Sequence, residues 1–530
     1  MSGPATPELV GAMLNPELYP HRPDAVELRE THISWVFVAG KRAYKVKKPV
    51  TLPFLDFGTL ERRRFMCHEE VRLNQRLAPQ IYQGVVAIVP RGDGYGIAPE
   101  GDPTAIEYAV EMQHVDETRS LAALAACGAL GSVEIDRVAR LIARFHEGAM
   151  PAAPEHRRLE PLHETLAENI ATLRKHCGAM LGPERLGEAE HYTRRFIEAR
   201  ASELVARGRR GMVRDCHGDL RAEHVIVPVE DDPYIYDCVE FSSALREIDV
   251  VADLAFLVMD LARLGEEALG ARLLAQYRLA GGDPGDDRLV AFFASYRAWV
   301  RAKVACLRLA ELTEEASARR PVEDDVSDLF ALGERFAWRS RRPLVLVICG
   351  VARSGKSTLA EALSHRSGLR HLQSDVVRKR LAGIEPTERA AKRHYTPEFT
   401  RRTYRELGTV ARAEFERSGG ALIDATFHRR SERDAFCEGF QGVESAIFVH
   451  CRAPRELLVR RARSRAEDPD SVSDATEEVV KQQLLAWEPL DELAPEDQTE
   501  IATQLTVAAQ IAAVERAVDD RVFGLEAGEQ

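Results

Sequence analysis

The stretch from Gly350 to Thr358 combines the residue types and the spacing that hold phosphate groups. It reads Gly-Val-Ala-Arg-Ser-Gly-Lys-Ser-Thr, follows the apolar run 344–349 and precedes a helix-forming segment. In such a loop the glycines let backbone N–H groups turn toward phosphates, the lysine reaches the β- and γ-phosphates, and the serine ligates Mg²⁺. The sequence therefore predicts that ATP contacts Gly350, Arg353, Ser354, Gly355, Lys356, Ser357 and Thr358, although Arg353 could instead point outward.

Carboxylates and cations downstream of this loop could complete a phosphoryl-transfer site. Asp375 and Arg378 follow another predicted strand, while Asp424 ends the apolar run 421–424 and Arg430 comes shortly after it. Transfer needs a carboxylate that orients or deprotonates the acceptor hydroxyl, and cations that hold the developing charge. We expect Asp375 as the catalytic carboxylate, Asp424 as a metal ligand with Ser357, and Arg378 and Arg430 at the substrate. The alternative for Asp375 and Arg378 is a helix-capping aspartate with a solvent-facing arginine.

Four arginines crowd one predicted helix farther along the chain: Arg460, Arg461, Arg463 and Arg465. The spacing of four puts Arg461 and Arg465 on one helical face. A lid helix that brings arginines to the nucleotide is the functional interpretation, and a solvated basic face is the alternative.

A second set of candidate residues lies in the N-terminal half. Asp219 belongs to the segment Cys-His-Gly-Asp-Leu, and Asp237 follows another short apolar stretch. One aspartate could act as base for an acceptor hydroxyl and the other as Mg²⁺ ligand. Aspartates that form turns at hairpin ends are the alternative.

The elements around these residues predict two kinds of fold. Residues 33–38 and 42–46 predict a hairpin, 61–77 a helix and 106–112 a strand, and the chain from 116 to 320 is mostly helical apart from 213–237. A charged, mixed stretch at 314–342 predicts a domain boundary. After it, strands and helices alternate, as in a parallel sheet with crossover helices.

The C-terminal motifs, across 343–518, resemble the small P-loop kinases grouped with zeta toxins, polynucleotide 5′-kinases and gluconate kinases. The resemblance rests on the phosphate loop, on Ser374-Asp-x-x-Arg378, on Asp424-Ala-Thr-Phe and on the arginine helix before Ser473-Asp-Ala. It implies that Asp375 activates the acceptor and that Arg461 and Arg465 contact nucleotide. Members of that family differ in acceptor, so the resemblance does not supply one.

The N-terminal motifs, across 25–310, resemble the aminoglycoside phosphotransferase and choline kinase family, which has a protein-kinase-like fold. The resemblance rests on the two aspartate motifs, on Asp253-Leu-Ala-Phe and on the strand Ala43-Tyr-Lys-Val-Lys-Lys. It implies catalysis by Asp219, metal binding by Asp237, a hinge at Met112 and an ATP-binding lysine, Lys45 or Lys47, paired with Glu69 or Glu70.

His224 departs from that family, which has asparagine at this position to ligate Mg²⁺. A neutral histidine can bind a metal, but Mg²⁺ prefers oxygen ligands. The N-terminal site is therefore either an active kinase site, with His224 among its metal ligands, or a ligand-binding lobe that regulates the C-terminal domain.

Taken whole, the order of motifs resembles bacterial fusions of an aminoglycoside phosphotransferase-like domain with a P-loop kinase domain. We expect a bilobal protein-kinase-like domain at 1–335 (small lobe 25–112, large lobe 113–320) and a P-loop α/β domain with a parallel sheet at 340–520. The predicted function is an ATP- and Mg²⁺-dependent kinase, an enzyme that phosphorylates a small hydroxylated acceptor.

Composition limits the remaining possibilities. The 530 residues carry a net charge of −12, which argues against a nucleic-acid 5′-end kinase or a toxin-like kinase, the third hypothesis. The nine cysteines form no C-x-x-C pair, and no signal peptide or membrane-spanning run is apparent. We expect a cytoplasmic protein that binds neither nucleic acid nor membranes; the sequence does not indicate its oligomeric state.

Overall fold

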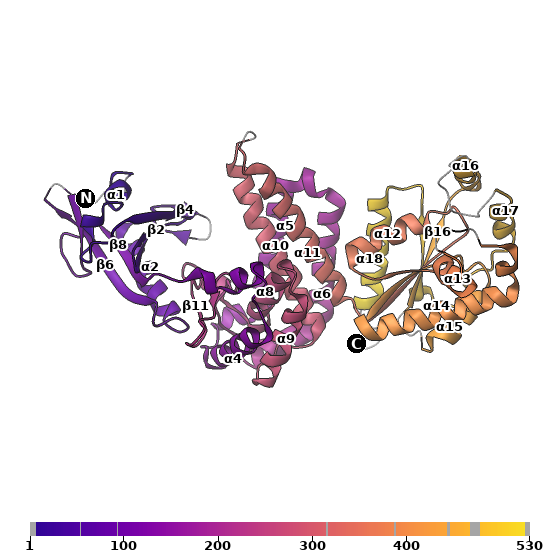
Figure 1. Ribbon diagram of the computed structural model, residues 1–530, viewed down its shortest axis with the longest axis horizontal. Coiled ribbons are helices and arrows are strands. Elements are labelled where there is room, and N and C mark those ends of the chain that lie inside the picture. Colours follow the sequence, from indigo (N-terminus) through magenta and orange to yellow (C-terminus); the bar gives the residue numbers. More distant parts are fainter. Residues whose placement is uncertain are drawn as a thin grey trace. The chain divides into compact units, whose positions relative to one another are not determined.

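The computed structural model describes residues 7–52, 55–92, 94–313, 316–385, 388, 390–442, 446–466 and 477–524 (Figure 1). The chain divides into two compact units, Met1–Leu162 with Glu203–Arg297, and His163–Ser202 with Ala298–Gln530. The sequence predicts one break between 335 and 340, but that break falls inside the second unit. Among the helices of the described residues, none has the length and apolar character needed to cross a bilayer.

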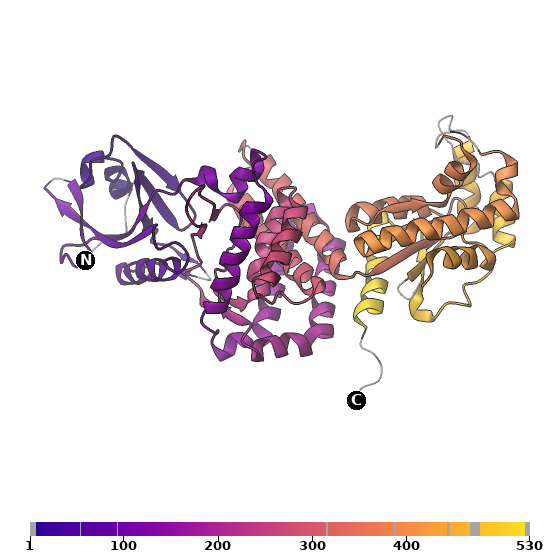
Figure 2. The ribbon, with the colours of Figure 1, turned by 60° about the horizontal axis from the view of Figure 1, so that its bottom comes forward.

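The first unit contains a six-stranded antiparallel sheet in the order β1-β2-β3-β8-β6-β7 (Figure 2). The predicted hairpin is present: β2 and β3 pair antiparallel, and Gly40 in the turn has a positive φ of 65°. Helix α2 (Leu60–Asn74) packs on β8 and β6 and begins at the capping side chain of Thr59. The strands are β1 (Val26–Glu30), β2 (Ser34–Ala39), β3 (Arg42–Lys47), β6 (Tyr82–Arg91), β7 (Gly94–Pro99) and β8 (Glu107–Gln113).

The rest of the first unit is helical, with short strand pairs that carry the aspartate motifs. Strand β9 (Val213–Asp215) pairs with β12 (Glu247–Asp249), and β10 (Val225–Ile226) pairs with β11 (Tyr234–Ile235). The principal helices are α4 (Ser132–Gly148), α8 (Val250–Arg263) and α9 (Glu267–Leu279). Helix α8 is buried along nearly its whole length, so it forms the central support of this region.

The second unit contains a five-stranded parallel sheet, as predicted, in the order β14-β15-β13-β16-β17. Strand β13 (Leu344–Cys349) is central and wholly buried because its alternate side chains enter two hydrophobic cores. One core includes α12 (Lys356–Ser367) and α18 (Val507–Phe523), and the other includes α14 (Pro397–Ser418) and α15 (Arg430–Phe440). The other strands are β14 (His371–Gln373), β15 (Gly420–Asp424), β16 (Ala446–Arg452) and β17 (Gln498–Ala502).

The charged stretch that predicts a linker is instead a helix, α11 (Arg319–Ser340). It belongs to the second unit together with parts of α5 (Glu160–Leu181), α6 (Pro183–Arg209) and α10 (Asp287–Glu311). Its last turns bury Phe336, Ala337 and Trp338. Its charges differ in surroundings: Glu334 is paired with arginines of α6 and α12, whereas Arg320 and Asp324 pair within α11 on the surface.

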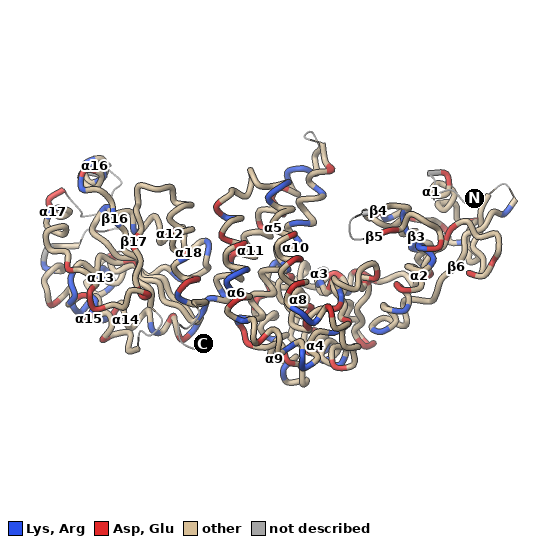
Figure 3. Tube along the Cα trace, turned by 180° about the vertical axis from the view of Figure 1, so that it is seen from behind, with Lys and Arg blue, Asp and Glu red and all other residues tan. Residues whose placement is uncertain are grey.

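Ion pairs within the second unit join α12 and α18 of the P-loop domain to α6 and α11. Figure 3 marks where the charged residues fall along these helices. Glu334 of α11 accepts two hydrogen bonds from Arg185 and lies 2.9 Å from Arg366 Nη1 of α12. Arg366 in turn donates to Glu515 of α18, which also accepts from Trp338 Nε1. Helix α12, which begins at the phosphate loop, is therefore anchored at its far end.

The pair Arg341–Asp519 tests how much the contacts between α11 and α18 contribute to the stability of the second unit. Both side chains are at most 2% exposed, with Nε and Oδ1 2.7 Å apart. We expect Asp519→Ala to lower the free energy of unfolding of the second unit by about 3–5 kcal/mol, because it leaves a buried guanidinium without its partner. Urea unfolding followed by circular dichroism measures the change. The surface pair Arg320–Asp324 gives the control, since Asp324→Ala should change stability by under about 1 kcal/mol; equal effects of the two variants would contradict the expectation.

Candidate active sites

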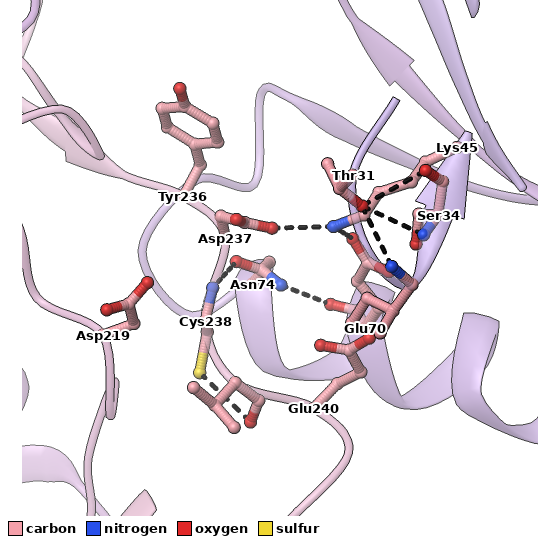
Figure 4. A network of polar contacts seen from close by, with 12 residues as sticks. Thr31, Ser34, Lys45, Glu70, Asn74, Asp219, Tyr236, Asp237, Cys238 and Glu240 are labelled. Carbon is pink, nitrogen blue, oxygen red and sulfur yellow. Dashed lines mark hydrogen bonds and ion pairs between the residues drawn. The ribbon is translucent and has the colours of Figure 1, made fainter. Parts of the chain in front are cut away.

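In the first unit, two lysines of β3 share one carboxylate of α2. Figure 4 shows Lys45 between Glu70 and Asp237. Lys45 Nζ lies 2.8 Å from Glu70 Oε1, and Lys47 Nζ lies 2.8 Å from Glu70 Oε2. The lysines reach the same carboxylate because residues two apart in a strand face the same side. Glu70 is thus the residue that pairs with both lysines, whereas Glu69 pairs with Arg72 on the surface.

The two lysines differ in what else they contact. Lys45 is 12% exposed, and its Nζ lies 2.7 Å from Asp237 Oδ1. Burial alone lowers the pKa of Lys45, but Asp237 and Glu70 raise it well above the ordinary value. Lys47 is fully buried, forms an ion pair with Glu240 and lies over the ring of Phe57. Lys45 is therefore the lysine whose ammonium group reaches the aspartate motif.

Asp237 is held in a left-handed backbone conformation, with φ of 64°. Its backbone N–H donates to the Tyr82 hydroxyl, and the next N–H, of Cys238, donates to Asn74 Oδ1. Asn74 also donates to the carbonyl of Glu70 and so connects the two parts of the site. Asn74 and Tyr82 are not among the predicted site residues. Asn74 lies in the predicted helix 61–77, but nothing in its spacing marks it as a partner of Cys238.

A buried carboxylate, Asp253, supports the loop that carries Asp219. Its oxygens accept from the N–H groups of His217 and Gly218, and His146 Nε2 lies 3.2 Å away. Burial raises the pKa of Asp253, but these partners lower it to about 2. Gly218 has φ of 84°, and a Cβ there would lie 2.9 Å from the carbonyl oxygen of Leu245, which explains the glycine.

Asp219 and Asp237 both face this site, and His224 lies between them. His224 Nδ1 is 3.0 Å from the Asp219 carbonyl oxygen, and Nε2 is 3.7 Å from Asp237 Oδ2. Arg221, which the sequence analysis did not single out, donates to both carboxylate oxygens of Asp219 at 2.9 and 3.0 Å. Burial raises the pKa of Asp219, yet the guanidinium of Arg221 brings it below the ordinary value. Met112, the predicted hinge, lies in β8 beside Ala43 of β3.

In the second unit, the phosphate loop connects β13 to α12 as predicted. Gly350 has φ of 139°, and a Cβ there would lie 2.6 Å from the Cys451 carbonyl oxygen; Gly355 has φ of 98°. Lys356 Nζ donates to the Val351 carbonyl across the loop at 2.9 Å. Burial lowers the pKa of Lys356, although Asp424 opposes this effect. Ser354, Ser357 and Thr358 complete the loop and the first turn of α12, while Arg353 adopts a positive φ of 66°.

Asp424 lies at the carboxyl end of β15, next to the start of α12. Its Oδ2 lies 3.4 Å from His371 Nε2, and the hydroxyl of Ser357 contacts the same carboxylate. Burial raises the pKa of Asp424, but His371, Lys356 and Ser357 lower it overall. A hydroxyl and a carboxylate oxygen in contact are a donor set that fits Mg²⁺.

The remaining predicted residues of this domain lie in different surroundings. Asp375 is in the first turn of α13 (Ser374–Ala382), 56% exposed and 3.1 Å from Lys379 Nζ, and the N-cap of the helix is Gln373. Arg378 is buried, donates to the His394 carbonyl at 2.7 Å and lies over the Tyr395 ring. The alternative of a capping aspartate beside a solvent-facing arginine is therefore wrong. Arg430 is 62% exposed at the start of α15.

The arginine helix is α16 (Arg455–Ala466). Arg461 donates to the carbonyls of Arg353 and Thr503, so its guanidinium lies against the phosphate loop. Arg463 pairs instead with Glu477 of α17 (Glu477–Leu485). The side chain of Arg465 and the segment Ser473-Asp474-Ala475 lie outside the described residues.

Comparison with known proteins assigns the two sets of motifs to two families. The family model described as "Phosphotransferase enzyme family" matches residues 66–292, and the one described as "AAA domain" matches 345–490. Uncharacterized proteins of Mycobacterium tuberculosis and Mycobacterium bovis are 31% identical over 466 residues, covering 86% of this chain and 89% of theirs. The chain belongs to their family. It is a fusion of an aminoglycoside phosphotransferase-like domain with a P-loop kinase domain.

Solved structures of single domains are also similar to parts of this fusion chain. A choline/ethanolamine kinase family protein from Mesorhizobium loti covers 61% of this chain and 94% of its own, with 15% identity and a TM-score of 0.37. A gluconokinase from Sinorhizobium meliloti covers 34% of this chain and 95% of its own, with 18% identity and a TM-score of 0.26.

Substitution of the two lysines separates their roles. Lys47→Met leaves Glu240 and one oxygen of Glu70 buried without a cation, so we expect a loss of about 3–5 kcal/mol in the free energy of unfolding. Lys45→Met should cost less stability, because Lys45 is partly exposed, and should weaken binding of a fluorescent ATP analogue. Unfolding curves and binding titrations, both in a Lys356→Ala background, measure the two effects. If a stably folded Lys47→Met variant loses binding of the analogue while Lys45→Met retains it, Lys47 and not Lys45 is the ATP-binding lysine.

Buried His217 predicts a pH dependence of stability. Its Nε2 donates to the Tyr236 carbonyl, its Nδ1 accepts from the Asp219 N–H, and burial lowers its pKa from 6.5 to about 4. His217 therefore takes up a second ring proton more readily in the unfolded chain than in the folded chain. Stability from this group is therefore complete above pH 6.5 and declines by up to about 3 kcal/mol as the pH falls toward 4. We expect the unfolding midpoint to depend less on pH in His217→Gln than in the wild type, and to depend on pH as in the wild type in the surface control His176→Gln. An unchanged pH dependence in His217→Gln would refute the attribution to His217.

Proposed function

We propose that the C-terminal domain transfers the γ-phosphoryl group of ATP to a hydroxyl group of a small acceptor. The observation that carries the proposal is the phosphate loop with Lys356, set beside the contact between Ser357 and Asp424. Backbone N–H groups and the lysine bind the β- and γ-phosphates, and the N-terminus of α12 adds its partial positive charge. Ser357 and Asp424 would hold Mg²⁺, which neutralises charge on the phosphate oxygens.

Asp375 is the group we assign to the acceptor hydroxyl. It follows β14 at the carboxyl edge of the parallel sheet, the edge at which the phosphate loop and Asp424 also lie. Its carboxylate is 56% exposed, forms an ion pair with Lys379 through Oδ2, and would orient a hydroxyl toward the γ-phosphate. Arg461, against the backbone of the phosphate loop, would contact the nucleotide.

We further propose that the N-terminal domain is a second ATP site. Lys45, fixed by Glu70 and Asp237, would bind phosphate oxygens, Asp237 would bind a metal ion, and Asp219 would face the acceptor. The strand that contains Met112 would offer backbone groups to adenine. In this arrangement the protein is an enzyme with two kinase sites that act on separate acceptors or in sequence.

Two features of the N-terminal site, Arg221 and His224, favour a second candidate function. Arg221 holds both oxygens of Asp219, and His224 replaces the oxygen ligand that Mg²⁺ prefers. Both features suit a lobe that binds nucleotide or another ligand without transfer and that regulates the P-loop kinase.

Transfer of labelled γ-phosphate from ATP into a pool of cell metabolites tests both candidates. We expect Lys356→Ala to lower transfer at the P-loop site by about 10²–10³-fold, because it removes a cation that contacts the transferred group. Asp219→Asn should remove a second, distinct product if both sites are kinases. Lys175→Ala, on the exposed surface of α5, is the control and should transfer at the wild-type rate.

The outcomes separate the candidates. Products lost independently in the two variants support two kinase sites, and their identities name the acceptors. A single product, lost in Lys356→Ala and retained in Asp219→Asn, supports the regulatory lobe. If Lys356→Ala changes no product, the proposed P-loop activity is refuted.

A further inference from the structure

The N-terminal site contains a cation of its own at the position where a metal ion would be expected. Arg221 Nε donates to Asp219 Oδ1 and Oδ2, Nη2 lies 2.9 Å from Oδ2, and Nη1 forms an ion pair with Glu223. The side chain is 16% exposed, so its charge is largely withdrawn from water. A guanidinium cannot be deprotonated in proteins, so its positive charge is permanent.

The hydrogen bonds of His224 fix which of its nitrogens could bind a metal. Nδ1 faces the Asp219 carbonyl oxygen at 3.0 Å and must donate, because a carbonyl cannot. Nε2 lies 3.0 Å from Arg221 Nη2 and must accept, because a guanidinium has no acceptor. This pattern is that of a neutral imidazole whose single free lone pair, on Nε2, is directed at Arg221.

That lone pair cannot accept a hydrogen bond from the guanidinium and bind a metal ion at the same time. A metal–nitrogen bond of about 2.1 Å would place the ion along the direction that Nη2 already occupies. The carboxylate of Asp219 is engaged by the same guanidinium. Asp219 and His224 therefore do not fit a divalent cation while Arg221 is in place, and among the described acidic groups that face Lys45, Asp237 keeps a 39% exposed carboxylate.

We infer that the guanidinium of Arg221 takes the place of a divalent cation between Asp219 and His224. The N-terminal site then holds a resident, permanent cation there, and a metal ion would enter only beside Asp237. The inference deepens the proposed function, since it rests on this site receiving the phosphates of a nucleotide. It differs from the expectation that His224 is a metal ligand.

Binding of Mn²⁺ to the full chain, followed by electron paramagnetic resonance without nucleotide, tests the inference. The wild type and His224→Ala should bind the same number of Mn²⁺ ions, because the Nε2 lone pair of His224 accepts a hydrogen bond from Arg221 and is not available to a metal ion. Arg221→Met should gain one Mn²⁺ per chain, since it frees both the Asp219 carboxylate and His224 Nε2. The double variant Arg221→Met/His224→Ala should lose that gain.

Arg272→Met is the matched control, because Arg272 also binds an aspartate, Asp136, through two hydrogen bonds but on the surface of the same unit. It should leave the number of bound Mn²⁺ ions unchanged. Fewer ions bound to His224→Ala than to the wild type would overturn the inference, and this comparison does not depend on Arg221→Met folding. No gain in an Arg221→Met variant with the wild-type circular dichroism spectrum would also overturn it. The count requires no turnover, so it is independent of the transfer assay for the proposed function.

Discussion

Charge that leaves water must be paired, and this constraint accounts for how both units are built around their sites. An isolated ion in a protein interior costs several kcal/mol, so every deeply buried charge needs a partner with good geometry. In the first unit, Glu70 holds two lysines and thereby joins the sheet to α2. In the second, Arg341 holds Asp519 and joins the end of α11 to α18. Loss of one member leaves the other uncompensated, so these pairs specify one arrangement of their elements.

The two candidate sites would meet the charge of phosphates in different ways. In the proposed function, the P-loop site uses backbone N–H groups, a helix terminus and one lysine, and Asp424 and Ser357 are the proposed oxygen ligands of a metal ion. The N-terminal candidate site takes its side chains from four separate segments: β3, α2, the loop that contains Asp219 and the loop that contains Asp237. A site made of one loop depends little on distant packing, whereas a site assembled from four segments depends on every contact that aligns them. Asn74, Tyr82 and Asp253 supply such contacts.

Within the second unit, the phosphate loop is mechanically linked to the helices before β13. Helix α12 carries Lys356 in its first turn and Arg366 in its last, and Arg366 binds both Glu334 of α11 and Glu515 of α18. A shift of α11 would therefore act on the helix whose N-terminus faces the phosphates. Because α6 and α10 contribute residues to both units, the division of the fold does not coincide with the order of motifs along the chain.

The sequence by itself determined the features that depend on neighbouring residues. The β2–β3 hairpin, helix α2, the parallel sheet and the phosphate loop are all present, because periodicity and glycine placement act locally. Tertiary structure alone decided that Glu70 and not Glu69 pairs with the lysines, that Arg378 is buried, and that Arg221 engages Asp219. It also turned the charged stretch after residue 318 into a packed helix. Each of these depends on the partner that the fold brings to the charge: a carboxylate for the lysines and Arg221, and a carbonyl oxygen and an aromatic ring for Arg378. The energy of burying a charge is set by that partner, which spacing along the chain does not reveal.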